Sequence, residues 1–116
     1  MRKYLPLLLL LLATPVYGEI GTASWYGSGN PKERLNEFTA SGERFNPEDF
    51  TAATYNYPFG TKLRVTNLST GKSVVVKVND RGPNRRLNRV IDLSRAAFAK
   101  ISMLKHGLII VKVERI

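Results

Sequence analysis

Short segments in which apolar and polar residues alternate make up most of the chain after its first eighteen residues. Such alternation predicts strands with one buried face, because successive side chains of a strand point to opposite sides. The strongest examples are residues 62–68 and 74–78, which a Ser-Thr-Gly-Lys turn separates, so we predict a hairpin there. Residues 21–27 and 108–113 are expected to be strands, and residues 50–57 a strand or an extended segment.

One helix is expected over residues 95–101, because its alanine, phenylalanine and isoleucine side chains form one apolar face. The stretch from Asp92 to Ser94 opens this helix, and either of these two side chains can cap its free amides. Residues 28–37 and 84–88 are expected to be loops. About six strands with one or two short helices predict a mainly β protein and favour a small closed barrel, which leaves no exposed strand edge.

The first eighteen residues are typical of a secretory signal peptide. Arg2 and Lys3 precede an apolar run at 5–12, and residues 16–18 (Val-Tyr-Gly) offer a cleavage site. The alternative, a transmembrane anchor, is disfavoured because the run is too short to span a bilayer. We therefore expect an exported protein in which residues 19–116 form one domain, too short for two separate cores.

Composition narrows the chemistry further. The chain has no cysteine, which excludes disulfides, thiol catalysis and a lipid-carrying cysteine. Its net charge of +9 has two interpretations. It indicates an anionic partner, such as cell-wall polymer or a membrane surface, or it serves only to keep the domain soluble. Nucleic acid is not expected, because no nucleic-acid recognition pattern is present. No set of histidine, cysteine and acidic residues has metal-ligand spacing, so neither metal nor cofactor is expected. The single histidine, His106, suits the end of a helical stretch.

Two acidic residues stand where a functional group is expected. Asp80 ends the Val-rich strand directly before Arg-Gly-Pro, and a strand end holds a side chain rigidly at the rim of a cleft. Glu43 follows Gly42 in a short turn-rich segment. The structural alternatives are a turn aspartate bonded to its own backbone and a solvated loop glutamate.

Six motifs in order are similar to those of the rare lipoprotein A (RlpA) family of bacterial cell-wall enzymes. They are residues 21–27 (GTASWYG), 39–43 (TASGE), 58–61 (PFGT), 65–68 (VTNL), 79–83 (NDRGP) and 91–97 (IDLSRAA). This resemblance covers nearly the whole chain after residue 18 and implies a six-stranded double-psi β-barrel. Expansins and some endoglucanases use the same barrel, so the fold does not settle the activity.

The resemblance implies lytic transglycosylation of peptidoglycan. Such an enzyme cleaves the β-1,4 bond between N-acetylmuramic acid and N-acetylglucosamine, prefers strands without stem peptides and leaves 1,6-anhydro ends. The family's two carboxylates correspond to Glu43 and Asp80. We expect Asp80 to act as acid and then base, and Glu43 to position it or to take the hydroxyl proton, although the roles can be exchanged. Partners would be glycan strands and cell-division proteins, and we expect a monomer.

Further site residues follow from the same motifs. Trp25 and Tyr26 suit a sugar site, because flat rings stack on pyranose faces, but neighbours in a strand face opposite ways and one of the two should lie in the core. Thr22 is expected to contact substrate. Arg81 can pair with Asp80 or bind the lactyl carboxylate of muramic acid. Asp92 either caps the helix or, as in the related endoglucanases and expansins, serves as a third site residue.

The chain departs from the family in three ways. Family members often carry a histidine where this sequence has Thr54, and neither the lipid-attachment cysteine nor a C-terminal peptidoglycan-binding repeat domain is present in it. We therefore expect a soluble, catalytic-domain version in the periplasm or cell-wall space. The change at Thr54 keeps open a different class, a non-catalytic expansin-like module that binds or loosens the wall.

Overall fold

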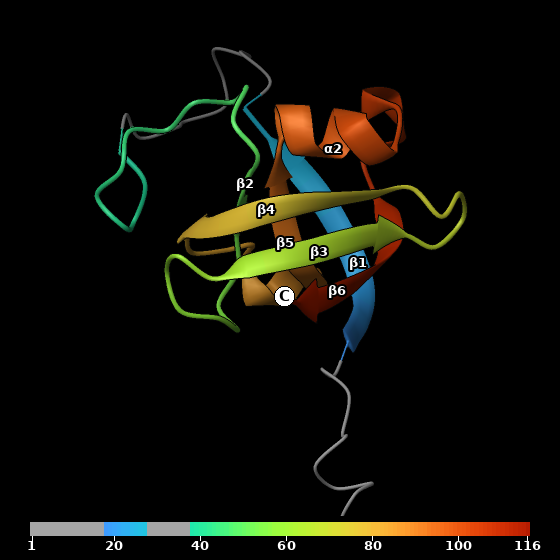
Figure 1. Cartoon of the computed structure of the whole chain (residues 1–116), viewed down its shortest axis with the longest axis horizontal. Helices are drawn as coiled ribbons and strands as arrows, with labels where there is room; N and C mark the ends of the chain where they lie inside the picture. Colours follow the sequence, from blue (N-terminus) through green and yellow to red (C-terminus); the bar gives the residue numbers. More distant parts are fainter. Residues whose placement is uncertain (1–17, 28–37) are drawn as a thin grey trace, which may run out of the picture.

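The structure, a computed structural model, describes residues 18–27 and 38–116. The expected leader, apart from Gly18, and the expected loop at 28–37 lie outside the described residues. Six strands form a closed barrel in the order β1-β5-β2-β4-β3-β6 (Figure 1). They are β1 (Gly18–Tyr26), β2 (Thr51–Ala53), β3 (Lys62–Asn67), β4 (Ser73–Asp80), β5 (Arg89–Ser94) and β6 (Ile109–Arg115). The predicted mainly β barrel is confirmed, although β2 is much shorter than the expected segment.

Strands that are distant in sequence lie next to one another in this barrel. β1 pairs with β5 and β2 with β4 in parallel, whereas the other four neighbouring pairs are antiparallel. The predicted hairpin is β3 with β4. The valine, leucine and isoleucine side chains on the inner faces of the strands meet Phe98 in one core. This branched core holds the strands rigidly in register, as interiors packed to crystal density do.

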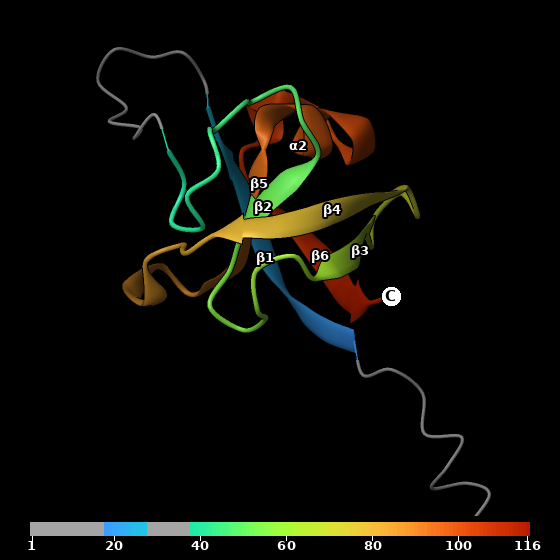
Figure 2. The ribbon, with the colours of Figure 1, turned by 60° about the vertical axis from the view of Figure 1, so that its left-hand side comes forward.

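The helices are short. α2 (Arg95–Ile101) lies over one end of the barrel and packs against β1, β4 and β5 (Figure 2). Two 3-10 turns, η1 (Arg85–Leu87) and η2 (Leu104–His106), complete the described elements. In the described ranges, no helix is both long and apolar enough to cross a membrane.

Ser94 is the residue that caps α2. Its hydroxyl accepts a hydrogen bond from the amide of Ala97 at 3.2 Å and donates one to the carbonyl of Asp49 at 2.5 Å. Asp92 does not open the helix but lies within β5. Of the two candidate caps, Ser94 is therefore confirmed and Asp92 is not the cap, because Asp92 is paired with β1 on one side and with β2 on the other.

β4 contains one extra residue near its end. Ala52 pairs with Val78, but the next residue of β2, Ala53, pairs with Asp80, so Asn79 has no partner of its own in β2. Such a β-bulge re-aims the side chains that follow it. Simple alternation after the inward-facing Val78 would turn Asp80 toward the core. The bulge instead leaves Asp80 half-buried at the barrel surface.

We predict that Ser94→Ala lowers the free energy of unfolding by about 2 kcal/mol, because the helix loses its cap and the Asp49 carbonyl loses a donor. Urea denaturation measures this loss. The control Ser73→Ala, at the exposed first residue of β4, should change stability by less than about 0.5 kcal/mol. Equal stability of the two variants would contradict this account of the cap.

Candidate active site

Four residues form a row across neighbouring strands on the outer face of the barrel. Strand register places Ser24 of β1 beside Asp92 of β5, Asp92 beside Ala53 of β2, and Ala53 beside Asp80 of β4. Their neighbours along the first three strands belong to the core: Ala23, Trp25, Ala52, Ile91 and Leu93. Two strand spacings separate the two aspartates, which puts their backbones about 9–10 Å apart. Only the small side chain of Ala53 lies between them, and Ser24 flanks Asp92 on the other side.

Asp80 is held by backbone amides. Its Oδ1 atom accepts hydrogen bonds from the amide of Ala40 at 3.0 Å and from its neighbour Arg81 at 2.9 Å. Among the described residues, no hydrogen bond reaches its Oδ2 atom. The carboxyl group therefore has a defined orientation and one oxygen available to a substrate.

The turn at residues 39–43 lies along the end of β4. It is closed by a hydrogen bond from the Thr39 amide to the Glu43 carbonyl at 2.7 Å, and an isolated bridge joins Phe38 to Arg44. The amide of Ser41 donates to the carbonyl of Asn79 at 3.1 Å. The bulge residue thus anchors the turn that carries Glu43.

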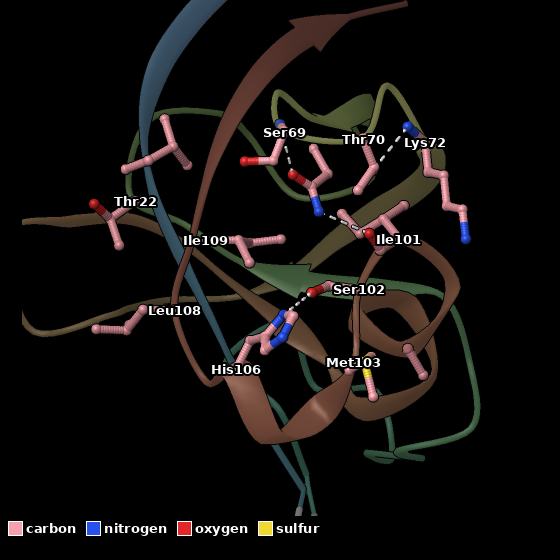
Figure 3. Close-up of a pocket in the computed structure, with 13 residues that line it drawn as sticks. Thr22, Ser69, Thr70, Lys72, Ile101, Ser102, Met103, His106, Leu108 and Ile109 are labelled. Atoms are coloured by element: carbon pink, nitrogen blue, oxygen red, sulfur yellow. Dashed lines mark hydrogen bonds between the residues drawn. The ribbon is translucent and has the colours of Figure 1, made fainter.

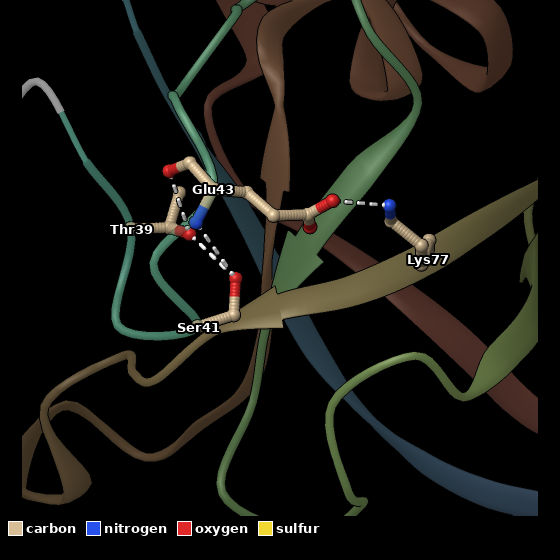
Figure 4. Close-up of polar contacts among 4 residues, drawn as sticks. All are labelled: Thr39, Ser41, Glu43 and Lys77. Atoms are coloured by element: carbon tan, nitrogen blue, oxygen red, sulfur yellow. Dashed lines mark hydrogen bonds and ion pairs between the residues drawn. The ribbon is translucent and has the colours of Figure 1, made fainter.

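Glu43 forms an ion pair with a lysine of β4. Its Oε2 atom lies 2.6 Å from the Nζ atom of Lys77, and both side chains are exposed (Figure 4). The hydrogen bond from Lys77, with smaller contributions from Asn79 and Ser41, lowers the pKa of Glu43 below its usual value. Glu43 is consequently a carboxylate at neutral pH.

Asp92 and Tyr26 complete the group of residues around the row. Asp92 accepts a hydrogen bond from the hydroxyl of Ser24 at 2.7 Å. Tyr26 stacks on Phe45 with ring centroids 4.9 Å apart. Burial raises the pKa of Tyr26, and the charges of Asp80 and Asp92 raise it further, so the phenol stays neutral. The structure thus brings Asp80, Asp92 and Tyr26 together, with Glu43 on the adjoining turn.

Trp25 lies on the other side of β1. Its ring packs against the core with its centroid 6.3 Å from that of Phe98, and its Nε1 atom donates to the carbonyl of Leu104 at 3.0 Å. Of the two adjacent aromatic residues, Trp25 is therefore the one that packs in the core, and Tyr26 the one near the carboxylates.

Thr22 lies away from the row of carboxylates and lines a hollow elsewhere on the barrel. This hollow, of about 860 Å³, lies between β1, β6, the turn after β3 and the segment that follows α2 (Figure 3). His106 lies there as well, with its Nδ1 atom 3.1 Å from the hydroxyl of Ser102. Neither Glu43 nor either aspartate of the row contributes to its lining.

Arg81 points toward the loop after β2. Its Nη1 atom donates to the carbonyls of Thr54 at 2.9 Å and Tyr57 at 3.1 Å, and its guanidinium group lies 3.9 Å from the ring centre of Phe59. No ion pair between Arg81 and Asp80 occurs within the described ranges. In this structure Arg81 braces the loop.

Thr54, at the position of the family's histidine, is 1% exposed. Its hydroxyl donates to the carbonyl of Val90 at 3.2 Å and accepts from the amide of Asn56. Its amide donates to the carbonyl of Asp80 at 3.2 Å. Thr54 therefore supports the end of β4 through its backbone, and its side chain is occupied.

Three contributors were missed from the sequence: Ser24, Phe45 and Lys77. Ser24 lies inside the first motif, but nothing local distinguishes it from a packing residue. The alternation of the valine-rich strand indicates only that Lys77 faces outward. In the part of the chain that the structure describes, no group of three or more acidic, histidine or cysteine residues could hold a metal ion.

A closed six-stranded barrel of this strand order, with acidic residues at its outer rim, is a double-psi β-barrel protein. The family model described as "Lytic transglycolase" matches residues 19–113, and the chain belongs to this family. The resemblance stated from the six motifs is thereby confirmed.

Curated relatives are considerably longer than this chain. A "Probable endolytic peptidoglycan transglycosylase RlpA" of Nostoc sp. is 51% identical over 94 residues, which cover 81% of this chain and 24% of the relative. An "Endolytic peptidoglycan transglycosylase RlpA" of Neisseria meningitidis is 43% identical over 100 residues, covering 86% of this chain and 40% of the relative. The chain thus spans between about a quarter and two fifths of their lengths.

Solved structures of lower identity share the fold. The Streptomyces papain inhibitor superposes with a TM-score of 0.67 at 20% identity, covering 89% of this chain and 97% of that one. An expansin of Clavibacter michiganensis gives a TM-score of 0.64 at 23% identity, covering 86% of this chain and 50% of that one. At such identities these likenesses show the fold alone.

We predict that Lys77→Met raises the pKa of Glu43 toward its usual value, because the largest cause of its lowering is removed. Carboxyl-carbon NMR titration of Glu43 measures this. Because folding lowers this pKa, the ion pair favours the folded state above the usual glutamate pKa, and this contribution disappears as the pH falls. Lys62→Met, opposite Lys77 in β3, is the control and should leave the titration unchanged; an equal shift in both variants refutes the assignment.

Proposed function

We propose that this chain is the catalytic barrel of a lytic transglycosylase that cleaves peptidoglycan glycan strands. Family membership and the names of the relatives support the reaction class. The observation that carries the proposal is the docking of the 39–43 turn on the end of β4, which holds Glu43 and Asp80 at the same rim. Strands lacking stem peptides are the preferred substrate in this proposal.

Asp80 is the acid and then the base. Its proton, on Oδ2, goes to the glycosidic oxygen as the bond between that oxygen and C1 of N-acetylmuramic acid breaks. The 6-hydroxyl oxygen of the same muramic acid forms the new bond to C1, and the Asp80 carboxylate takes the hydroxyl proton. The product is a 1,6-anhydro end, Asp80 regains its proton, and no water is consumed. One carboxyl group therefore performs both proton transfers.

Glu43 serves this reaction as a fixed negative charge. Because Lys77 keeps Glu43 ionised, Glu43 is unsuited to deliver the first proton. A carboxylate on the adjoining turn stabilises the positive charge that develops at C1 in the transition state. Asp92, oriented by Ser24, is the third acidic group and binds sugar hydroxyl groups beside Ala53.

The residue pattern of the first eighteen positions and the charge of the chain support a place of action outside the inner membrane. The positive and then apolar pattern of the first eighteen residues supports export to the periplasm or cell-wall space. A net charge of +9 favours association with the anionic wall polymer. We further propose that the barrel acts as a monomer, and that division proteins bring it to the wall.

A second function, glycan binding without cleavage, is favoured by one observation. Thr54 replaces the family's histidine, and its hydroxyl is buried and occupied by the Val90 carbonyl and the Asn56 amide, so it moves no proton. If the reaction requires that histidine, the same row of carboxylates binds the strand as in an expansin. Release of 1,6-anhydro ends distinguishes the two functions.

We predict that Asp80→Asn lowers the release of 1,6-anhydro ends from peptide-free glycan strands by at least about a hundredfold, because general acid and base catalysis is lost. Glu43→Gln should lower it by about tenfold to a hundredfold, since water screens an exposed charge. Mass spectrometry of the products measures both losses.

Glu114→Gln is the matched control for this experiment. Glu114 also lies beside a lysine, 3.9 Å from Lys112, but on β6, away from the row. The Glu114→Gln variant should release 1,6-anhydro ends at the same rate as the wild-type chain. Near-normal turnover in both site variants would refute the catalytic assignment, whereas glycan binding without any product from the wild-type chain would favour the second function.

A further inference from the structure

The ring of Tyr26 is held in one position by its stack on Phe45. One face of its ring is covered by Phe45, at a centroid distance of 4.9 Å and an interplanar angle of 16°. Gly27 permits this arrangement, because a Cβ atom there would lie 2.9 Å from Pro47 and 3.0 Å from the Phe45 ring. The ring therefore has a defined position beside the row of carboxylates, and its remaining polar feature is the hydroxyl group.

The Tyr26 hydroxyl is buried and has no hydrogen-bond partner among the described residues. Buried hydroxyl groups nearly always have a partner, and leaving one without costs about 1–3 kcal/mol. Among the described residues, Thr51, Asn79 and Arg89 also carry a buried polar atom without a partner. Tyr26 differs in its place, because it follows Ser24 by two residues on the same face of β1, on the side of the two aspartates. Because the Tyr26 hydroxyl is covered in this structure, a substrate group reaches it only when the covering atoms move, and the hydroxyl then supplies a donor that no group of the described residues occupies.

The charges around this hydroxyl define what that partner can be. The carboxylates of Asp80, on β4, and Asp92, on β5, both act on Tyr26, and Glu43 with Lys77 lies on the adjoining turn. A carboxylate only accepts hydrogen bonds, and the neutral phenol supplies one proton. A group that joins both must accept from the phenol and donate to a carboxylate. A sugar hydroxyl group does both.

We infer that Tyr26 is a substrate-positioning residue whose phenol donates a hydrogen bond to a hydroxyl group of the glycan, while the Asp92 carboxylate accepts a second hydrogen bond from the same hydroxyl group. This role rests on the proposed function, since the glycan is the ligand, but it is separate from proton transfer. It also differs from ring stacking, because Phe45 already covers one face of the Tyr26 ring. Ser24 sets the orientation of Asp92 within the same arrangement.

The test compares two variants that each remove one phenol oxygen. Tyr26→Phe keeps the ring and its stack on Phe45. The control Tyr57→Phe removes a partly buried phenol whose surroundings are Glu19 and Arg115 and include neither aspartate of the row. Each variant is measured for the KM and kcat of anhydro-end release from peptide-free glycan strands. Affinity for short peptide-free glycan fragments is measured by calorimetry in a Glu43→Gln background, where turnover is slowed.

Tyr26→Phe should raise the KM and the dissociation constant by between about threefold and tenfold, the effect of one hydrogen bond. Its kcat should change less, because the contact is made before bond cleavage. Its melting temperature should not fall, because an unsatisfied buried hydroxyl is removed. Tyr57→Phe should stay within about twofold of the wild-type chain in affinity. Equal affinities of the two variants would overturn the inference.

An NMR measurement on the wild-type chain gives a second test of the role of Tyr26. With tyrosines labelled at the Cζ carbon, the NMR signal of Tyr26 should shift when glycan fragments are added, while that of Tyr57 stays in place. If the wild-type chain binds but does not cleave, the proposed function fails, and the affinity comparison and the Tyr26 signal still decide the inference. If Tyr26 does not respond to bound glycan, or no fragment binds, the inference is overturned.

Discussion

The extra residue in β4 at Asn79 is the constraint on which the site depends. The valines that precede it alternate into the core, and the same alternation continued by one step would direct the Asp80 carboxylate inward. An ionised carboxylate in an apolar interior costs several kcal/mol. The bulge turns Asp80 outward and exposes the carbonyl of Asn79 to the amide of Ser41. One local irregularity therefore keeps the core apolar and attaches the turn that carries Glu43.

The closed barrel gives this arrangement its precision. β2 contributes only three residues, yet it lies between β4 and β5 and separates Asp80 from Asp92 by the narrow Ala53. Ladder hydrogen bonds and a core of branched side chains hold these strands, so the distance between the carboxylates is set by the sheet and not by side-chain freedom. The polar groups at this rim differ in charge. Lys77 keeps Glu43 ionised, whereas burial and the nearby aspartates keep the phenol of Tyr26 neutral.

Particular elements show how far the sequence could be interpreted. The 62–68 and 74–78 segments were correctly predicted as a hairpin, and residues 95–101 as a helix, because alternation, turn residues and an apolar face are local signals. The sequence offered both Ser94 and Asp92 as the cap and could not choose between them, since both residue types suit a cap and the pairing of Asp92 with β1 and β2 is not visible locally. The opposite facing of Trp25 and Tyr26 was predictable, but which of them faces the core was not.

By itself, then, the sequence determined the hairpin, the first and last strands, the helix, the six motifs and the two candidate carboxylates Glu43 and Asp80, because each depends on residues close together in the chain. It did not show β5. Only the tertiary structure decided that Asp80, Asp92 and Tyr26 meet, that Lys77 binds Glu43, and that Arg81 braces a loop. The physical reason is the strand order: β1, β5, β2 and β4 are neighbours in the barrel but not in the chain, and a bulge exists only between paired strands.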